Sequence, residues 1–215
     1  MLVDLDIVCY RASAVAWDNT ENGITLALET LTTLRDVLKP SKEMLFLSGD
    51  RNFRKTIYPE YKANRIKMER PPCLEEVKSW FIEQNLVEPI QEHLEADDLL
   101  GLHQTEDSCI VSIDKDLLMI PGWHYNYVKD DLCYVSEWAG IYAFYRQLLV
   151  GDPADNIKGA KGIGKAKAEK ILANCTTESE LLKAVEPYFS CFEELDMTAS
   201  CLWIQRKGRV NWNAV

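Results

Sequence analysis

The chain has 215 residues, of which 47% are hydrophobic and 27% are charged, and its formal net charge is −10. This composition is typical of a soluble globular protein with enough apolar side chains for one large or two small domains. No apolar run is long enough to span a bilayer and no basic region precedes the first apolar residues, so we expect a cytoplasmic protein without a membrane partner. The seven cysteines are scattered and form no Cys-x-x-Cys pair, which argues against a disulfide framework or a zinc site.

Two basic segments interrupt this acidic chain. Residues 51–70 contain seven basic and two acidic residues, and residues 158–170 contain five basic and one acidic residue. Because these segments contribute +5 and +4, the remainder carries −19. Such segregation creates local positive surfaces that attract nucleic acid, although solvated lysines without a partner are the simpler alternative.

The first half of the chain alternates between predicted strands and helices. Residues 3–7 are predicted as a short strand with an acidic end, and apolar residues at helical spacing predict a helix over 24–38 that Pro40 stops. Residues 44–47 are typical of a buried parallel strand. Residues 51–72 are basic and contain three prolines, so we expect a long excursion rather than part of the core.

The pattern changes in the second half. The alternation of strands and helices up to residue 150 predicts a parallel α/β sheet. Beyond residue 150 the pattern is wholly helical, and we expect residues 203–215 to be polar and partly disordered. The remaining predicted elements are a helix from residue 74, a helix over 95–104, a strand over 108–113, an apolar turn over 117–120, a hairpin over 125–135 and a helix over 138–149.

Acidic residues follow each apolar strand that we predict before the hairpin. Because ligand sites in open α/β sheets lie at the carboxyl ends of the strands, these carboxylates should converge. Clustered carboxylates repel one another, and a hard divalent cation, Mg²⁺ or Mn²⁺, is the natural compensation where histidine is absent. The acids concerned are Asp4, Asp6, Asp50, Glu95, Asp97, Asp98, Asp114, Asp116, Asp152 and Asp155.

Each of these acids also has an ordinary structural explanation. Asp50 suits a turn, residues 95–98 suit the first turn of a helix, Asp114 suits an N-cap, and Asp152 before Pro153 suits the start of a turn. Their coincidence at one edge of one sheet favours a metal site over separate structural roles.

The stretch from residue 151 to residue 172 combines two kinds of chemistry. Asp152 and Asp155 are followed by a Gly162-Ile163-Gly164 turn and then by a lysine-rich helix. The carboxylates can hold a cation, and a glycine turn that leads into a helix N-terminus can hold a phosphate. A protein that brings both together is a candidate for cutting nucleic acid.

Several motifs together resemble the flap endonuclease/5′–3′ exonuclease family, especially its bacteriophage members. They occur in family order over about residues 1–173, and this family resemblance implies a PIN-like, Rossmann-like α/β domain followed by a helix-hairpin-helix element. The expected division is a nuclease domain over 1–150 with an arch-like segment over 51–72, a DNA-binding region over 151–205 and a polar tail over 206–215. The motifs are Leu47–Asp50, Pro59–Arg65, Glu95–Asp98, Ser112–Asp116 and Gly151–Ile157, with the Gly-Ile-Gly-Lys hairpin after them.

The resemblance also implies roles for individual residues. Lys62 and Arg65 match the basic residues that engage the scissile phosphate and the 5′ strand. Many relatives carry glycine at the position of Leu5, and the role of Asp6 as a ligand stays open. Asp4, Asp50, Glu95 and Asp97, with Asp98 beside them, match a first metal position, and Asp114, Asp116, Asp152 and Asp155 match a second. Gly162, Gly164, Lys165 and Lys167 match the hairpin that grips duplex DNA, where relatives often hold K⁺.

The expected activity is therefore that of a two-metal, structure-selective 5′–3′ exonuclease or flap endonuclease. We expect a monomer that acts on DNA with a 5′ end, nick or flap, with RNA in RNA–DNA hybrids as a further substrate, in the cytoplasm of a host bacterium if a phage encodes it. A PIN-type ribonuclease would share the acids but rarely carries the hairpin. A non-catalytic helix-hairpin-helix protein would use the acids structurally, and a Mg²⁺-dependent phosphatase would leave the basic segments without a purpose.

Overall fold

The computed structural model describes residues 1–67 and 69–213, and a five-stranded sheet lies at its centre. Four strands are parallel, and β5 runs antiparallel to β4 at one edge. The predicted α/β fold with a mostly parallel sheet is thereby confirmed. In sheet order the strands are β2 (Met44–Phe46), β1 (Leu2–Asp4), β3 (Cys109–Val111), β4 (Gly122–Asn126) and β5 (Asp131–Val135).

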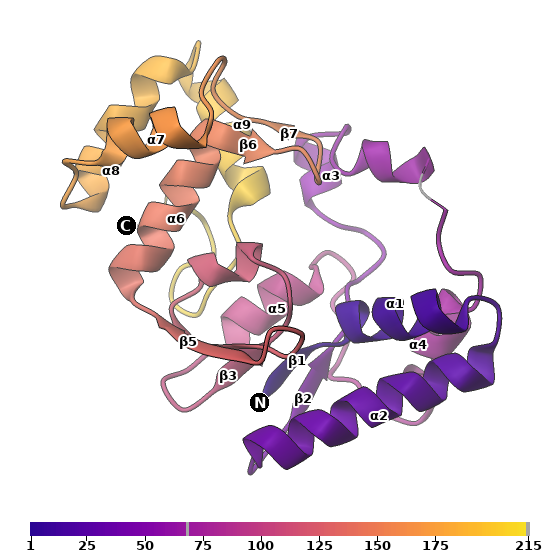
Figure 1. Ribbon diagram of the computed structural model, residues 1–215. Helices are drawn as coiled ribbons and strands as arrows, with labels where there is room; N and C mark the ends of the chain where they lie inside the picture. The colour runs from indigo at the N-terminus through magenta and orange to yellow at the C-terminus, as the bar shows by residue number, and fades with distance from the viewer. Residues whose placement is uncertain (68, 214–215) are drawn as a thin grey trace.

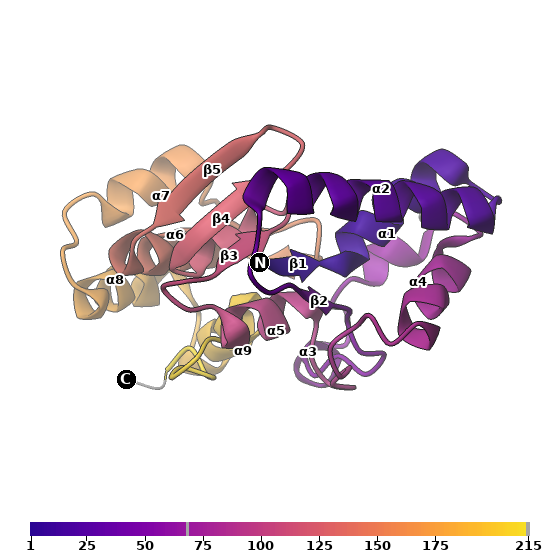
Figure 2. The same cartoon turned by 90° about the horizontal axis from the view of Figure 1, so that it is seen from below.

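Helices cover both faces of this sheet (Figures 1 and 2). The helices α1 (Leu5–Ala16) and α2 (Thr20–Leu38) lie on one face, with α4 (Leu74–Glu83) packed against both. The helix α5 (Ala96–His103) lies on the other face, against β1 and β2. The predicted helices over 24–38, from residue 74 and over 95–104 are present, although α2 begins four residues earlier.

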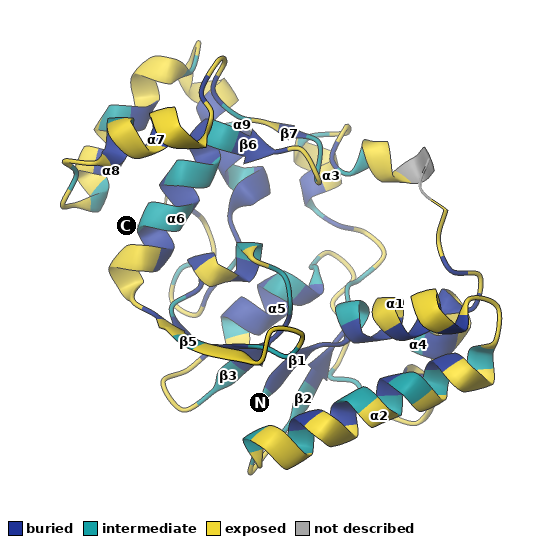
Figure 3. Cartoon of the chain, viewed as in Figure 1, coloured by how far each residue is buried: buried dark blue, intermediate teal, exposed yellow. Residues whose placement is uncertain are grey.

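Alternate residues of the strands enter two separate hydrophobic cores. Leu2 and Ile110 face the core that α5 and the later helices complete, whereas Val3 and Val111 face the core that α1, α2 and α4 complete. This alternation follows from the two-residue period of a strand, and burial on both faces explains the continuous apolar runs. Figure 3 shows the contrast between these buried strands and the exposed edge strand β5.

The second half of the chain is mainly helical, but it contains one pairing that the sequence pattern did not indicate. A short two-stranded sheet, β6 (Gly151–Asp152) and β7 (Ile157–Lys158), holds the 151–158 stretch as a tight loop. The expectation of a wholly helical region was therefore wrong. The helices are α6 (Glu137–Val150), α7 (Lys165–Leu172), α8 (Glu178–Val185) and α9 (Phe192–Leu202), and short 3₁₀ turns lie at Asp116–Met119 and Glu186–Tyr188.

Two further predictions near the site were wrong. The first strand ends at Asp4 instead of residue 7, because the Asp4 side chain accepts the Ile7 N–H and caps α1. The 51–72 excursion contains α3 (Arg54–Ile57) and a 3₁₀ turn at Ala63–Lys67, and it contributes buried side chains of Arg54 and Tyr61. It is therefore partly integrated into the fold.

The C-terminal segment is also more ordered than its polarity indicates. Trp203 packs edge-on against Phe144, Trp212 is buried, and the Arg209 guanidinium pairs with Glu178. The expected disorder of residues 203–215 was therefore wrong as far as residue 213, and residues 214–215 lie outside the described chain. The proposed domain boundaries stay predictions. No helix in the described residues combines the length and apolar character needed to cross a membrane.

Candidate active site

The candidate site lies where the strand order reverses between β1 and β3. From β1 the chain continues to β2 on one side of it, and β3 is added on the other. Such a switch point opens a crevice at the carboxyl ends of the strands, and Asp4 ends β1 there. Ser112, which follows β3, donates its hydroxyl to Asp4 at 2.8 Å. The carboxyl ends of the two strands are thus in direct contact.

A first group of carboxylates gathers around this contact. Burial and then the charge of Asp6 raise the pKa of Asp4 to about 7, despite the hydrogen bond from Ser112. Burial, followed by the charges of Asp4 and Asp114, raises the pKa of Asp97 well above its ordinary value. Because the charges of Asp4 and Asp114 both act on Asp97, these carboxylates lie near enough to repel one another.

A second group continues from the first. Burial and the neighbouring carboxylates of Asp114 and Asp152 raise the pKa of Asp116 to about 7. Asp116 accepts a hydrogen bond from Gln147 of α6 at 3.1 Å, and Asp152 accepts the Ala154 N–H at 2.9 Å. The 3₁₀ turn after β3 and the β6–β7 loop therefore bring two sets of acids together.

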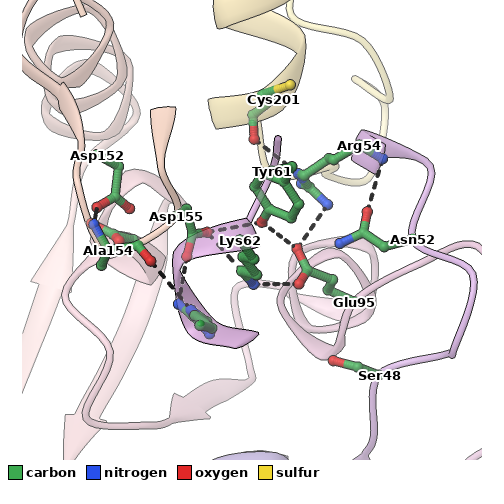
Figure 4. A network of polar contacts seen from close by, with 12 residues as sticks. Ser48, Asn52, Arg54, Tyr61, Lys62, Glu95, Asp152, Ala154, Asp155 and Cys201 are labelled. Carbon is green, nitrogen blue, oxygen red and sulfur yellow. Dashed lines mark hydrogen bonds and ion pairs between the residues drawn. The ribbon is translucent and has the colours of Figure 1, made fainter. Parts of the chain in front are cut away.

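Tyr61 links Glu95, at the start of α5, to Asp155 of the β6–β7 loop (Figure 4). Its hydroxyl lies 2.7 Å from Glu95 and 2.8 Å from Asp155, and the Lys62 ammonium contacts both carboxylates. Burial alone would raise the pKa of Glu95, but Lys62 and Arg54 outweigh it and the pKa falls to about 2. Burial raises the pKa of Asp155 even though Lys62 and Arg65 oppose the shift.

The arch-like segment docks onto the β6–β7 loop. The Lys62 N–H donates to the Asp155 carbonyl at 2.9 Å, and the Asn156 amide donates to the Glu60 carbonyl at 2.8 Å. Arg65 pairs with the Asp155 carboxylate and also donates to the Ala154 carbonyl. The sequence-predicted cations Lys62 and Arg65 are thus both held at Asp155.

The side chains of three acids singled out in the sequence are engaged by other groups or exposed. Asp98 is fully buried and accepts two hydrogen bonds from Arg54, at 2.7 and 2.8 Å. Asp6 pairs with Lys78 and accepts the Ser48 N–H. Asp50 is exposed, and within residues 1–67 and 69–213 no hydrogen bond or ion pair connects its side chain to the other acids.

Sequence reasoning missed two residues that organise the site. Arg54 is buried and bonds the carbonyls of Cys201 and Trp203 as well as Asp98, so it ties α3, α5 and the end of α9 together. Tyr61 lies inside the Pro59–Arg65 motif, but nothing in the sequence indicates its two carboxylate partners. Nothing in the spacing distinguishes Arg54 from the exposed basic residues around it.

The donors present fit a hard divalent cation. All of them are carboxylate oxygens, and burial followed by the charges of neighbouring carboxylates raises the pKa values of Asp4, Asp97 and Asp116. In the described part of the chain, no three acidic, histidine or cysteine side chains already form a ready coordination set. The ammonium of Lys62 instead pairs with Glu95, and the guanidinium of Arg65 pairs with Asp155.

The 159–164 turn forms a separate basic surface. Gly162 has a φ of 74°, which favours glycine, and Gly164 is the N-cap of α7. Ile163 is buried and anchors the turn, whereas five lysines around it are exposed. The turn therefore presents positive charge outward. The lysines are Lys158, Lys161, Lys165, Lys167 and Lys170.

The fold is thus that of an open α/β protein with a mostly parallel sheet, and its acidic site lies at the carboxyl ends of the strands, where ligand sites of such proteins lie. The family model "5′-3′ exonuclease, N-terminal resolvase-like domain" matches residues 1–138, and the chain belongs to this 5′–3′ exonuclease family of nucleases. The resemblance seen in the sequence is thereby confirmed.

Curated relatives agree with this assignment. The chain is 28% identical over 218 residues to a 5′–3′ exonuclease of Buchnera aphidicola, covering 86% of this chain and 74% of that protein. It is 31% identical over 171 residues to DNA polymerase I of Caldicellulosiruptor bescii, covering 67% of this chain. The chain spans only 20% of that polymerase.

A solved structure shares the fold. A bacteriophage T5 protein co-crystallised with metal ions superposes with a TM-score of 0.74 and 17% identity, covering 94% of this chain and 88% of that one. Another structure of the T5 protein is described as a flap endonuclease in a pseudo-enzyme-product complex with DNA and metal ions, with a TM-score of 0.65, 18% identity and coverage of 94% and 90%.

Proposed function

We propose that this chain is a divalent-metal-dependent 5′–3′ exonuclease and flap endonuclease that hydrolyses phosphodiester bonds near the 5′ end of DNA. The observation that carries the proposal is the meeting of carboxylates from β1, α5, the turn after β3 and the β6–β7 loop beside Lys62. The names of the relatives and the DNA complex of the T5 protein support it. RNA in RNA–DNA hybrids is a further proposed substrate, and the acting species is a monomer.

The acids would hold two Mg²⁺ or Mn²⁺ ions in neighbouring sets. A pair of such ions lowers the pKa of an attacking water and stabilises the attacking and leaving oxygens of a phosphodiester. Asp50 joins the first set only if its exposed side chain turns inward, and Asp98 supports that set through Arg54. The first set is Asp4, Glu95 and Asp97, and the second is Asp114, Asp116, Asp152 and Asp155.

Lys62 and Arg65 would act on the substrate phosphate. The Lys62 ammonium sits between Glu95 and Asp155, where a scissile phosphate held by these acids' cations would lie. A fixed positive charge there stabilises the charge that develops on the phosphate oxygens. The planar guanidinium of Arg65, which is half-exposed, can hold a neighbouring phosphate with two hydrogen bonds.

The 159–164 turn would hold the duplex away from the chemistry. Its N–H groups and exposed lysines contact phosphates without reading bases, so substrates are selected by structure: a free 5′ end, a nick or a flap. Gly162, Gly164, Lys165 and Lys167 would provide this contact, and this turn would also hold a K⁺ ion. Binding should weaken steeply as the salt concentration rises.

Product mapping tests the proposal. A 5′-flap, a nicked duplex and an RNA–DNA hybrid of the same sequence, with the single-stranded RNA beside them, are incubated with the protein, with and without Mg²⁺ or Mn²⁺. We expect metal-dependent products released from the 5′ strand near the junction or nick. Cleavage of single-stranded RNA in preference to all three would instead indicate a PIN-type ribonuclease. Failure to cleave any substrate with either metal would indicate a non-catalytic DNA-binding protein.

A further inference from the structure

Asp6 lies in the first turn of α1, two residues after Asp4, yet its side chain is engaged elsewhere. One carboxylate oxygen accepts the Ser48 N–H at 2.8 Å, and the other pairs with the Lys78 ammonium of α4. The side chains of Asp6 and Lys78 are only 23% and 19% exposed. Both oxygens of Asp6 are therefore used by protein groups from two other elements.

Ser48 connects Asp6 to α5. Its hydroxyl oxygen accepts the N–H of Ala96, the first residue of α5, at 2.9 Å. The N–H groups in the first turn of a helix have no partner within the helix, so Ser48 satisfies a group that would otherwise be unpaired. Ala96 stands between Glu95 and Asp97, and the position of its N–H fixes the start of the helix that carries both carboxylates.

Gly49 strengthens the same connection. Its N–H donates to the Leu94 carbonyl at 2.9 Å, and a Cβ atom at this position would come within 2.3 Å of the Gln91 carbonyl oxygen. Only glycine permits so close an approach of the two backbones. The turn after β2 is thus pressed against the segment that leads into α5.

We infer that Lys78, Asp6 and Ser48 form a positioning relay that sets the metal-binding geometry of Glu95 and Asp97, and that Asp6 is not itself a metal ligand. The inference rests on the proposed function, because it assigns the relay a purpose at the proposed first metal set. Groups behind a metal's ligands orient them, and the removal of such groups weakens metal binding. None of the three relay residues touches substrate.

The two roles for Asp6 make opposite predictions for Lys78. If Asp6 were a ligand that Lys78 neutralises, Lys78→Gln would release the carboxylate and tighten metal binding. Removal of a positive charge near the site would act in the same direction. In the relay, Lys78→Gln instead loosens Asp6 and Ser48 and weakens metal binding. Ser48→Ala carries no charge change, so only the relay predicts an effect.

The test is Mn²⁺ binding to the full chain, measured by calorimetry or by paramagnetic resonance of the free ion, with a thermal midpoint for each variant. We expect Lys78→Gln and Ser48→Ala each to weaken the tighter Mn²⁺ site about tenfold, and Lys78→Arg and Ser48→Thr to restore it within about threefold. Because Lys78→Gln and Ser48→Ala act through one relay, the loss of Mn²⁺ affinity in the double variant should be smaller than the product of the two single losses.

Thr20→Val is the matched control. The Thr20 hydroxyl contacts Glu76 on the same helix as Lys78, but it makes no connection to α5. We expect its Mn²⁺ affinity to equal that of the wild type.

Three results would overturn the relay. They are unchanged affinity in Ser48→Ala, tighter binding in Lys78→Gln, and an equal loss in Thr20→Val, which would indicate general loosening of α4. Absence of Mn²⁺ binding by the wild type would instead overturn the proposed function, and the purpose of the relay with it.

Discussion

At the scale of single residues, Asp155 connects the β6–β7 loop to the arch-like segment. Its carboxylate contacts Tyr61, Lys62 and Arg65. Asp155→Asn keeps the shape and the hydrogen bond with Tyr61 but removes the charge that a metal needs. We expect this variant to lose cleavage of a 5′-flap in Mg²⁺ while its affinity for the same DNA stays unchanged. Full activity of the purified variant would remove Asp155 from the metal site.

The variant Lys62→Ala distinguishes a role of this lysine in the chemical step from a role in DNA binding. Since its ammonium is fixed at Glu95 and Asp155, Lys62→Ala should act on the reaction more than on the affinity. We expect the single-turnover rate to fall roughly 10²–10³-fold. The dissociation constant for duplex DNA, measured in Ca²⁺, should change far less. A loss of affinity that accounts for the whole rate defect would contradict this role.

The candidate site could be predicted only in part at this scale. The convergence of Asp4 and Asp116 was predictable, because each follows a parallel strand and the carboxyl ends of such strands meet at one edge of the sheet. The roles of Asp98 and Asp6 were not, because a carboxylate's partner depends on which cation the fold brings to it. Asp98 pairs with Arg54, which lies more than forty residues earlier in the chain, and no local spacing reveals that pairing.

At the scale of elements, Arg54 holds three segments together. Its guanidinium is 2% exposed and bonds Asp98 of α5 and the carbonyls of Cys201 and Trp203 at the end of α9. Arg54→Met leaves the buried Asp98 carboxylate without a cation to balance its charge, so the free energy of unfolding should fall by about 3–5 kcal/mol. Urea denaturation measures this loss.

A partly exposed ion pair provides the control for Arg54. Arg35 and Glu43 pair with 40% and 30% of their side chains exposed. Arg35→Met should therefore cost about 1 kcal/mol or less. Equal losses in the two variants would show that burial does not set the contribution of Arg54.

A second prediction at the scale of elements concerns DNA binding by the lysines beside the 159–164 turn. Lys165 and Lys167 are exposed beside the 159–164 turn, so each should neutralise one phosphate. The double alanine variant should reduce the slope of log affinity against log salt by about 1.8. The exposed Lys42, which precedes β2 at the amino end of the sheet, is the control, and Lys42→Ala should leave the slope unchanged. An unchanged slope in the double variant would place the DNA elsewhere.

Regular elements were predictable where one periodicity dominated. The apolar spacing of α2 and α6 identified both helices. The strand predicted over 3–7 was wrong because the Asp4 cap turns the chain into α1 after three residues. The β6–β7 pair escaped prediction because two-residue strands carry no periodicity of their own.

At the scale of the whole molecule, the acids should make the metal-free protein sensitive to pH. The pKa values of Asp4 and Asp116 are about 7 in the fold, compared with an ordinary value of 3.8. Between these values the folded state holds protons that the unfolded state has lost, so stability falls as the pH rises. Glu95, with a pKa near 2, acts in the opposite direction only at lower pH.

In EDTA we therefore expect the thermal midpoint to fall between pH 5 and pH 8. Mg²⁺ should raise the midpoint more at pH 8, where the carboxylates are ionised. Asp116→Asn should flatten the pH dependence in EDTA. A midpoint that rises across this range would show that the acids do not control it.

The number of divalent ions bound tests most directly whether the acids form two metal sets. Calorimetric titration with Mn²⁺ should give two ions for each wild-type chain. Asp97→Asn, in the first set, and Asp116→Asn, in the second, should each retain one. The same two ions in both variants, or none in the wild type, would contradict a metal centre built from the acids at this edge of the sheet.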